Sequence, residues 1–526
     1  MTDHTLTLTF HGAAQTVTGS CMEFRLGKKA ILVDCGMFQG SRTIEALNYQ
    51  PSPVDPASLD AVILTHAHID HSGLLPKLVA QGFTGAVWCT QETIDLLEHM
   101  LADSGRIHEF EAERRNRRRD RAGDDPFTPL YTEHDAMIAW SQCKAIPLET
   151  WFTPVPGFRA RLWNAGHILG SASVELEAGG TRVMCSGDVG PANKAFYADP
   201  EGPSGFDHIV CEATYGNRER EKVTIAERRS MLEAEVLAAR ARGGNLVIPI
   251  FALERTQELL LDLGALINQG RIPGTHVFVD SPLANRITGV FEQYSAELED
   301  TGTSNIFANP AFHFVSEVAE SMRLNSVTGA VIMAASGMCE AGRIRHHLLN
   351  NLHRSRSTIL FVGFQAQGTL GRVILEGAKV VRISGNDVRV RAQIRQIDSY
   401  SAHADRAELV AWIAARLPIA GSLFLDHGEP EAAEGLRRLL QTQLPDLEVR
   451  LPVIGERYAL PSHSMARRET TGRKDLPLAT GRDWQNAYAD FATSLKARLV
   501  QMPNDHQREK ALQKLQEVLD GYGGHP

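Results

Sequence analysis

The stretch Ala61-Val-Ile-Leu-Thr-His66-Ala-His68-Ile-Asp70-His71-Ser-Gly73 concentrates four potential metal ligands at the end of a predicted strand. Alternate side chains of an extended segment point the same way, so we expect His66, His68 and Asp70 on one side. His71 then opens the next predicted helix. Imidazole nitrogens and carboxylate oxygens are the donors that zinc prefers, so this turn predicts a metal site.

Three later segments place a histidine or an aspartate in a glycine-containing loop directly after a predicted strand. They are Trp163–Ala172 with His167, Met184–Gly190 with Asp188, and Leu423–Glu429 with His427. A lone histidine in such a loop is more often structural than a ligand. A catalytic zinc uses three protein ligands and a water, however, and the first turn alone offers four. We therefore expect the later residues to complete a metal site.

Length and composition exclude several classes of protein. The 526 residues, 43% hydrophobic and 22% charged, are ordinary for a globular chain of about two to four domains. Seven cysteines without a CxxC pair exclude a disulfide scaffold and suit a reducing cytosol. We expect a cytoplasmic protein without a membrane partner, because no apolar run approaches ~20 residues and no secretory signal is visible. The net charge of −9 requires that any bound polyanion be held by local cations or metal.

The order of predicted elements indicates an α/β architecture in which one domain is inserted into another. Residues 1–208 have the pattern of short strands with few helices, which favours two sheets covered by helices. Over 209–395 helices and strands alternate as in a parallel sheet, and the strand-rich pattern returns over 396–465. Strands are expected at 5–10, 21–26, 30–33, 61–64, 159–163, 173–176, 182–185, 245–250, 275–279, 329–334, 358–362 and 422–425. Helices are expected at 72–79, 226–242, 253–267, 343–349 and 406–417.

Residues 466–526 are predicted to form a helical C-terminal extension. Asp483 can cap its first helix, in which Trp484, Tyr488, Phe491 and Leu495 recur at helical spacing. This apolar stripe needs a partner surface. Packing on the chain's own body is favoured over a contact in a homodimer.

The series His66-x-His68-x-Asp70-His71, His167 and Asp188 resembles the ligand series of the metallo-β-lactamase superfamily. The resemblance implies an αββα sandwich with a metal site at one sheet edge. Asp34, in Ile31-Leu-Val-Asp34-Cys-Gly36, matches an early aspartate that supports the ligands without contacting the metal. The resemblance also implies two Zn²⁺ per chain: one held by His66, His68 and His167, the other by Asp70, His71 and His427, with Asp188 bridging. Some relatives also accept Mn²⁺.

Two alternative metal chemistries are disfavoured by the residues present. Iron-binding relatives generally carry Glu at the position of His68, which argues against di-iron oxygen chemistry. Cys185 and Cys211 are soft ligands by type, but each lies in an apolar predicted strand. We therefore expect both cysteines in the core.

Three further motifs resemble the β-CASP branch of this superfamily, whose members are nucleic-acid-processing nucleases. Cys211-Glu212-Ala-Thr-Tyr-Gly216 resembles its first signature, Ser399-Tyr-Ser401-Ala-His403-Ala-Asp405 its second, and Leu425-Asp-His427-Gly-Glu429 its third. A histidine in the third signature is typical of RNA-processing members. The resemblance covers about residues 1–465, and bacterial ribonucleases and the cleavage and polyadenylation endonucleases are the best models.

This resemblance implies a zinc-dependent ribonuclease in RNA processing or decay that hydrolyses phosphodiester bonds with a two-metal-activated hydroxide. Two Zn²⁺, less the charges of Asp70, Asp188 and one hydroxide, leave about +1, which matches one phosphodiester. The predicted catalytic residues are Asp70, Glu212 and His403. Glu212 favours the charged imidazole of His403, which we expect to protonate the leaving 3′ oxygen. The alternative for this pair is support of the zinc ligands.

Two other segments are candidate RNA contacts. The loop Ala334–Gly342 is a glycine- and serine-containing turn into a predicted helix, which can bind phosphate through its backbone N–H groups. Its Ser336 and Gly337, together with the hydroxyl of Ser401, are the candidate phosphate-binding residues. The run Arg114–Arg121 holds six arginines in eight residues, of which Arg114, Arg117 and Arg118 are candidates for gripping single-stranded RNA. Such a run is more often a solvated helix face.

Three alternative functions stay open at this point. A β-CASP nuclease could act on DNA, although His427 disfavours it. The same scaffold could hydrolyse a small ester or thioester, although Glu212 and His403 argue against that function. A non-catalytic RNA-binding relative is disfavoured because all seven ligand positions are filled. The motifs do not distinguish an endonuclease from a 5′-exonuclease, and they leave sequence preference and oligomeric state open.

Overall fold

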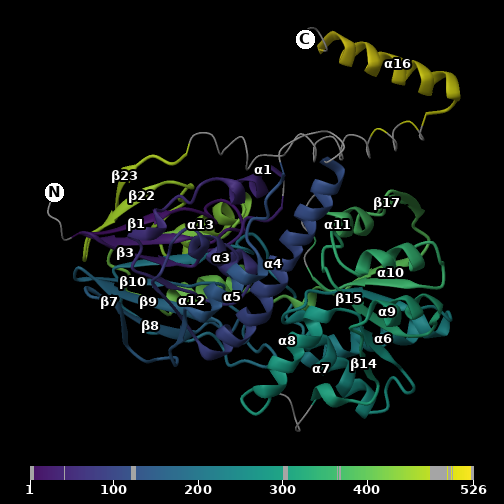
Figure 1. The fold of residues 1–526 in the computed structure, drawn as a ribbon, viewed down its shortest axis with the longest axis horizontal. Coiled ribbons are helices and arrows are strands. Elements are labelled where there is room, and N and C mark those ends of the chain that lie inside the picture. Colours follow the sequence, from purple (N-terminus) through teal and green to yellow (C-terminus); the bar gives the residue numbers. More distant parts are fainter. Residues whose placement is uncertain are drawn as a thin grey trace. The chain divides into compact units, whose positions relative to one another are not determined.

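Three large sheets organise the chain between residues 5 and 473 (Figure 1). The computed structural model describes residues 5–40, 42–119, 126–299, 306–363, 365, 369–473, 495, 499 and 502–522. Two of the sheets form a sandwich, and the third belongs to an inserted domain. This confirms the predicted class, an αββα sandwich with an inserted parallel α/β domain.

The sandwich consists of an eight-stranded and a seven-stranded sheet. The first has the order β23 (Arg467–Thr470), β22 (Arg457–Leu460), β1 (Leu6–Phe10), β2 (Met22–Leu26), β3 (Lys29–Val33), β4 (Ala61–Ile63), β5 (Ala86–Cys89), β6 (Cys143–Ala145). The second has the order β21 (Glu448–Arg450), β20 (Ser422–Asp426), β11 (His208–Glu212), β10 (Thr181–Cys185), β9 (Ala172–Ala178), β8 (Phe158–Asn164), β7 (Phe152–Val155). Between the sheets, the ring of Phe424 lies 5.5 Å from Phe10 and 4.9 Å from Tyr458.

Helices follow the strands of the sandwich. They are α1 (Arg42–Glu45), α2 (Ile69–Ser72), α3 (Leu75–Ala80), α4 (Gln91–Arg119), α5 (Glu133–Ser141), α12 (Arg406–Ala414) and α13 (Pro430–Gln443), with 3₁₀ turns at Ala46–Tyr49, Pro56–Ser58 and Asp398–Tyr400. The helix predicted over 72–79 is present as α3, but it starts later, at Leu75, because residues 69–72 form the separate short helix α2. Pro76 lies in the first turn of α3, where a backbone N–H has no partner within the helix, so proline costs no hydrogen bond there.

The insert is built on six strands that all run parallel. Their order is β14 (Phe312–Phe314), β13 (Val277–Val279), β15 (Val331–Ala334), β12 (Leu246–Pro249), β16 (Thr358–Phe361), β19 (Gln393–Gln396). Its other elements are α6 (Ile225–Ala241), α7 (Arg255–Asn268), α8 (Pro282–Gln293), α9 (Val318–Arg323), α10 (Ile344–Asn351), α11 (Leu370–Leu375), the hairpin β17 (Val380–Ile383) and β18 (Asn386–Arg389), and 3₁₀ turns at Ile306–Ala308 and Leu324–Ser326.

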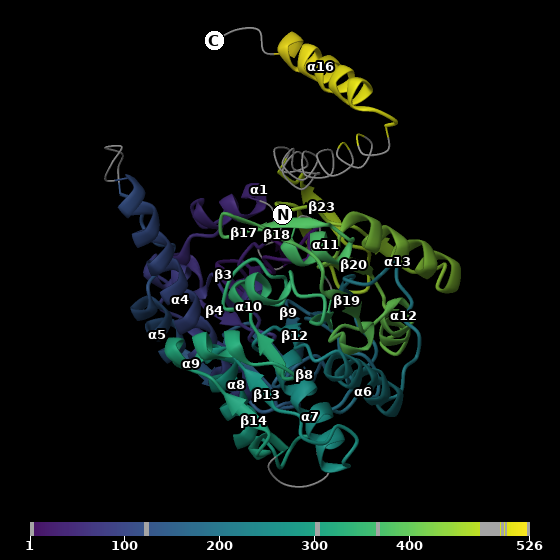
Figure 2. The ribbon, with the colours of Figure 1, turned by 90° about the vertical axis from the view of Figure 1, so that its right-hand side faces the viewer.

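Both faces of the insert's sheet are covered by helices (Figure 2). Leu246 and Ile248 of β12 pack in one apolar cluster with residues of α6, α7 and α8. Val247, which points to the opposite face, packs in a second cluster with residues of α10 and α11. A strand covered on both faces is apolar at every position, which is why β12 has the sequence Leu-Val-Ile-Pro.

The boundary between sandwich and insert follows from strand pairing. The start of the insert predicted at residue 209 falls inside β11, which pairs with β10 and β20 of the sandwich. The inserted segment therefore begins after Glu212 and extends to the end of β19 at Gln396. The sequence of β11 is typical of a buried apolar strand in either domain, so the sequence alone does not reveal which sheet the strand joins.

Buried polar contacts connect the insert to the sandwich. Lys194 of the sandwich lies 2.5 Å from the Oε1 of Glu254, and the hydroxyl of Tyr197 donates to its Oε2 at 2.6 Å. The rings of Phe196 and Phe291 lie 5.9 Å apart across the same boundary. Glu254 itself has φ of +73°, a conformation that costs energy in a residue with a side chain and persists only where its surroundings fix it.

Residues 477–526 form a second compact unit, in which the structure describes helix α16 (Asp505–Tyr522). The predicted cap Asp483, and Trp484, Tyr488 and Phe491 of the predicted stripe, lie outside the described residues. Of the helices that the structure describes, none is both long and apolar enough to cross a membrane.

Candidate metal centre

The predicted ligands follow the carboxyl ends of strands that meet at one edge of the sandwich. Strands β3 and β4 run parallel, so Asp34 and the turn from His66 to His71 leave the first sheet at the same edge. In the second sheet β10, β11 and β20 also run parallel, and Glu212 pairs in register with Asp426. Asp188 and His427, which follow β10 and β20, therefore reach the same edge.

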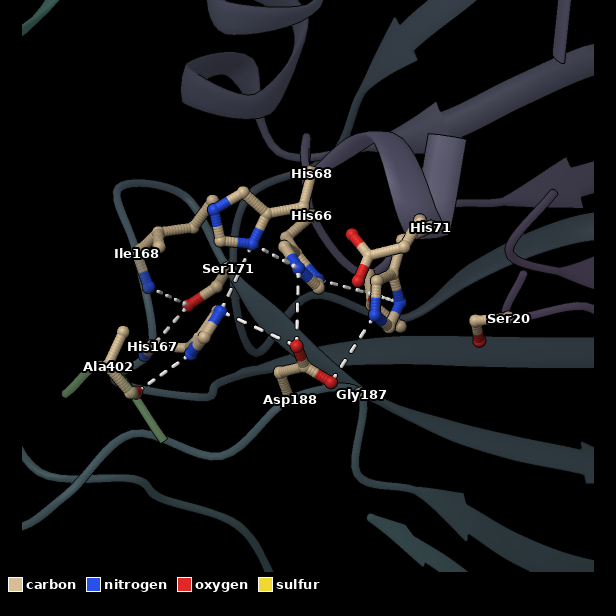
Figure 3. Close-up of polar contacts among 12 residues, drawn as sticks. Ser20, His66, His68, His71, His167, Ile168, Ser171, Gly187, Asp188 and Ala402 are labelled. Carbon is tan, nitrogen blue, oxygen red and sulfur yellow. Dashed lines mark hydrogen bonds and ion pairs between the residues drawn. The ribbon is translucent and has the colours of Figure 1, made fainter. Parts of the chain in front are cut away.

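The first ligand group consists of His66, His68 and His167 (Figure 3). Its ring nitrogens face one another, with His66 Nε2 at 3.1 Å and His167 Nε2 at 3.2 Å from His68 Nδ1. The Oδ2 of Asp188 lies 3.7 Å from His66 Nε2 and 3.5 Å from His167 Nε2. One donor atom from each of these four residues lies within 4.8 Å of all the others.

The second ligand group consists of Asp70, His71 and His427. His71 Nε2 lies 3.2 Å from His427 Nε2, which in turn lies 3.8 Å from Asp70 Oδ2. The other oxygen of Asp188, Oδ1, lies 3.3 Å from His71 Nε2. Asp188 thus presents one oxygen to each ligand group, the arrangement of a carboxylate that bridges two ions.

Asp70 reaches the second ligand group because it lies on a helix. The extended geometry expected for this residue is wrong: Ile69–Ser72 forms α2, so Asp70 and His71 leave from its first turn. An extended chain would have directed Asp70 to the same side as His66 and His68. The helical turn instead separates the two groups.

Asp34 touches none of the ligand nitrogens that face the centre, yet it fixes His71. It is fully buried, and its Oδ2 accepts a hydrogen bond from His71 Nδ1 at 2.7 Å. The same oxygen accepts from the hydroxyls of Thr65 and Ser20, and Oδ1 accepts from the backbone N–H of Thr65. With its Nδ1 proton held there, His71 offers a lone pair on Nε2 toward the centre.

Backbone and hydroxyl groups orient three more of the histidines. His167 Nδ1 donates to the carbonyl of Ala402 at 2.8 Å, and His66 Nδ1 lies 3.0 Å from the hydroxyl of Thr65. The hydroxyl of Thr214 lies 3.2 Å from His427 Nδ1. Each contact leaves the ring's other nitrogen for the centre.

Burial makes the first ligand group neutral. It lowers the pKa of His66 and His167 well below the usual value and that of His68 to about 4. Neutral imidazole is the form that binds a metal ion. Burial also opposes the charge of Asp188, but His427, His71 and His403 around it hold its pKa well below the usual range. Asp188 therefore keeps its negative charge.

Carboxylates surround the two histidines of the second ligand group. Burial opposes a proton on His427, but Asp188 and Asp70 raise its pKa to about 9. His71 behaves alike, since Asp188 and Asp34 outweigh burial and raise its pKa. Carboxylates that draw protons onto buried imidazoles also attract a divalent cation, which binds in place of those protons.

The arrangement fits a metal centre. Lone-pair-bearing nitrogens that face each other at 3.1–3.2 Å repel unless a proton or a cation lies between them. Oδ1 of Asp188 is buried and has no hydrogen-bond partner among the described residues, an arrangement that is costly without a bound cation. Imidazoles and carboxylates without a thiolate suit zinc and, less selectively, manganese. Cys185 and Cys211 are buried within β10 and β11.

Glu212 and His403 lie beside this centre. Glu212 is buried, and its Oε2 lies 3.2 Å from His403 Nδ1, while Oε1 accepts from the backbone N–H of Val189 at 2.6 Å. His403 Nδ1 also lies 3.8 Å from Asp188 Oδ2. The side chain of His403 is 22% exposed and that of Asp70 is 23% exposed, so solvent and a substrate can reach both groups.

The candidate phosphate contacts have local partners of their own. The hydroxyl of Ser336 bonds with the backbone of Ala341, both within the loop after β15. A Cβ added at Gly337 would lie 2.5 Å from the ring of Phe251, so glycine allows close packing there. Ser401 Oγ accepts from the backbone N–H of His403 at 3.3 Å.

The arginine run, as far as the structure describes it, lies at the carboxyl end of α4, which ends at Arg119. Arg114 and Arg117 are exposed, and Arg117 lies 3.6 Å from Glu113 one turn earlier. The side chain of Arg118 lies outside the described residues.

Lys194 is a functional residue that the sequence did not single out. Its ammonium group donates to the backbone carbonyl of His167 at 2.5 Å and pairs with Glu254 of the insert. It thereby connects the loop that carries one ligand to the inserted domain. A lone lysine in the loop after Asp188 gives no sequence signal of this role.

Comparisons with known proteins match most of the chain to known families. The model described as the metallo-beta-lactamase superfamily matches residues 15–225, and the Beta-Casp domain matches 256–374. The Zn-dependent metallo-hydrolase RNA specificity domain matches 387–452, the segment that carries His403 and His427.

Individual proteins show the same relationship. Ribonuclease TTHA0252 of Thermus thermophilus is 34% identical over 85% of this chain and 98% of its own. Cleavage and polyadenylation specificity factor subunit 3-I of Arabidopsis thaliana is 28% identical over 83% of this chain and 61% of its own. A crystal structure of a protein of unknown function from Enterococcus faecalis V583 shares the fold, with a TM-score of 0.52 at 16% identity over 87% of this chain and 100% of that chain.

These matches confirm the resemblance drawn from the motifs. The chain is a homologue of ribonucleases and carries the domains of a Zn-dependent metallo-hydrolase. It belongs to the β-CASP family of the metallo-β-lactamase superfamily.

Proposed function

We propose that this chain is a ribonuclease that hydrolyses single-stranded RNA with two zinc ions, in RNA processing or decay. The observation that carries the proposal is the shared carboxylate of Asp188. Its two oxygens face separate ligand groups, and Oδ1 has no other partner among the described residues. A carboxylate placed between two sets of nitrogens suits a pair of cations rather than one.

The residues present assign a role to each ligand group. His66, His68 and His167 would hold one ion, and Asp70, His71 and His427 the other, with Asp188 contacting both. When bound, zinc lowers the pKa of water toward ~7 and offsets the negative charge that develops on the phosphate. Asp34, Thr65 and the carbonyl of Ala402 keep the imidazoles in their binding tautomers.

His403 supplies the proton that the leaving 3′ oxygen needs. Its Nδ1 is occupied by Glu212, which leaves Nε2 to donate to the substrate. Because Glu212 is itself held by the N–H of Val189, the imidazole keeps one orientation. The partial exposure of His403 and of Asp70 lets a phosphodiester approach this side of the centre, while His66, His71 and His167 stay buried.

RNA is the substrate that the domain composition favours. The RNA specificity domain supplies both His403 and His427, so the same segment completes the metal ligands and the proton donor. The ribonuclease of Thermus thermophilus matches over nearly its whole length. Both observations favour RNA over DNA.

The test is cleavage of RNA labelled at the 5′ or 3′ end by the purified full chain. We expect cleavage with zinc, none after chelation, and recovery when zinc is restored. Asp70→Ala should abolish cleavage, whereas Asp60→Ala, which removes a carboxylate from a partly exposed pair with Lys29, should not. Product lengths from the two labels distinguish internal cleavage from stepwise removal at the 5′ end. Cleavage that survives chelation would overturn the proposal.

A further inference from the structure

Arg255 is a partly buried cation that makes no ion pair with the residues that the structure describes. It is the first residue of α7, and the Nε and Nη1 of its guanidinium are buried with no hydrogen-bond partner among those residues. Burial lowers its pKa from the usual value, because no ion pair offsets the loss of hydration. A buried guanidinium normally has a carboxylate beside it. Arg228 of the same domain illustrates this, since its Nε lies 2.8 Å from Asp262.

The two acidic residues nearest to Arg255 in the chain have other partners. Glu254 pairs with Lys194 and accepts from the hydroxyl of Tyr197. Glu258 lies 3.4 Å from Arg228. Neither carboxylate makes an ion pair with Arg255 within the part of the chain that the structure describes. Both carboxylates still favour the charge of Arg255 at longer range, Glu258 the more strongly, so an anion from outside would add the direct partner that the guanidinium lacks among the described residues.

Arg255 lies on the side of the insert that adjoins the metal centre. Tyr215 and Arg220 are among its electrostatic neighbours. The ring of Tyr215 lies 5.8 Å from that of His403, and Arg220 donates to the backbone carbonyl of His403 at 2.6 Å. Arg255 is thus separated from the proposed proton donor by one layer of side chains.

The segments around Arg255 contribute a glycine beside the guanidinium and an exposed aromatic residue. Gly363, which follows β16, has no side chain to occupy the space beside the guanidinium: a Cβ added there would lie 3.7 Å from Nη2. Phe251, in the loop that leads into α7, is 37% exposed. A cation without a carboxylate partner, together with an exposed aromatic ring, is the pairing by which proteins hold single-stranded nucleic acid.

We propose that Arg255 binds a phosphate of the RNA that flanks the scissile bond. The inference rests on the proposed function and adds a substrate contact outside the metal centre. A guanidinium presents donors in a planar fork that matches two phosphate oxygens. A phosphodiester also carries one negative charge, which would give this cation the charged partner that it lacks among the described residues. The position at the amino end of a helix of 14 residues adds favourable backbone dipoles.

The test combines Arg255→Gln with RNA in which one phosphate at a time is replaced by an uncharged methylphosphonate. Binding is measured by fluorescence anisotropy on the full chain carrying Asp70→Ala, so that the RNA stays intact. We expect one methylphosphonate position to weaken binding about tenfold with Arg255 present and to have no effect with Arg255→Gln. Arg255→Gln should also reduce the slope of log K against log salt by about 0.7, the value for one phosphate on a single strand.

Arg271→Gln is the matched control. Arg271 lies just beyond the other end of α7 and pairs with Glu233. Its replacement removes the same charge as Arg255→Gln does. Because Arg271 already pairs with a carboxylate at the other end of the helix, its replacement should leave the methylphosphonate pattern unchanged. Melting temperature separates binding from a structural role. We expect Arg255→Gln to melt no lower than the parent, since it removes a buried charge that lacks a carboxylate partner.

The outcomes distinguish this inference from the proposed function. If the parent cleaves RNA with zinc but Arg255→Gln leaves every methylphosphonate penalty in place, the inference fails and the function stands. A drop of several degrees in melting temperature with an unchanged methylphosphonate pattern would assign Arg255 to the fold instead. If RNA binds through Arg255 but zinc-dependent cleavage is absent, the proposed function fails and the phosphate contact stands.

Discussion

Replacing Asp34 with Asn should weaken zinc binding at the second ligand group while leaving the first almost unchanged. Asp34 accepts four hydrogen bonds, from His71 Nδ1, the hydroxyl of Ser20, and both the hydroxyl and the N–H of Thr65. The amide group of asparagine turns one accepting oxygen into a donor. The N–H of His71 or a donor group of Thr65 then points at the new NH₂ group, and that hydrogen bond is lost.

The magnitude follows from the role of Asp34 as a contact that orients a ligand. Removing such a contact typically lowers metal affinity about 10- to 100-fold, which corresponds to about 1.4–2.7 kcal/mol. Because only His71 bonds directly to Asp34 among the histidines that the structure describes, the loss should fall on the ion held with Asp70 and His427.

The assay is a zinc titration against a chromophoric chelator, which resolves two affinities per chain. Asp207→Asn is the control, since Asp207 is buried and accepts hydrogen bonds from Arg182, Ser462 and His463 elsewhere in the sandwich. We expect the control to retain both affinities. The reasoning is refuted if Asp34→Asn binds both zinc ions as tightly as the parent, or if it weakens both equally.

Three further predictions test other parts of the account. His403→Ala should lower kcat about 10²- to 10⁴-fold with both zinc ions retained, measured by turnover and metal content; loss of zinc would instead make Glu212 and His403 a support for the ligands. Lys194→Met should lower the free energy of unfolding by about 3–5 kcal/mol in urea, because it leaves Glu254 buried and unpaired. Adding Glu254→Gln should recover part of this loss, and an equal loss in the double variant would contradict the ion-pair explanation. Replacing Arg114 and Arg117 with Gln should flatten the salt dependence of RNA binding by about 0.7 for each phosphate that these arginines neutralise, and an unchanged slope would make the run a solvated helix face.

The sequence predicts the residues of the centre better than their geometry. A strand followed by a histidine or an aspartate in a glycine-containing loop indicates where side chains leave a sheet, so His167, Asp188 and His427 could be found. The conformation of the first turn could not, because the same residues fit an extended chain or a helix.

Contacts between distant segments account for most of what the sequence left open. The pairing of β11 with β20, and with it the start of the insert after Glu212, depends on strands more than two hundred residues apart. The buried pair of Lys194 and Glu254 depends on how the insert packs against the sandwich. No local pattern marks a charge that is buried by packing between two domains.

The most direct test of a two-ion centre is the zinc content of the purified full chain, measured by native mass spectrometry beside that of His427→Ala and Asp188→Asn. We predict two zinc ions in the parent, one in His427→Ala, and less than one in Asp188→Asn, because Asp188 faces both ligand groups. A parent without transition metal, or an Asp188→Asn variant that keeps two ions, would contradict the account.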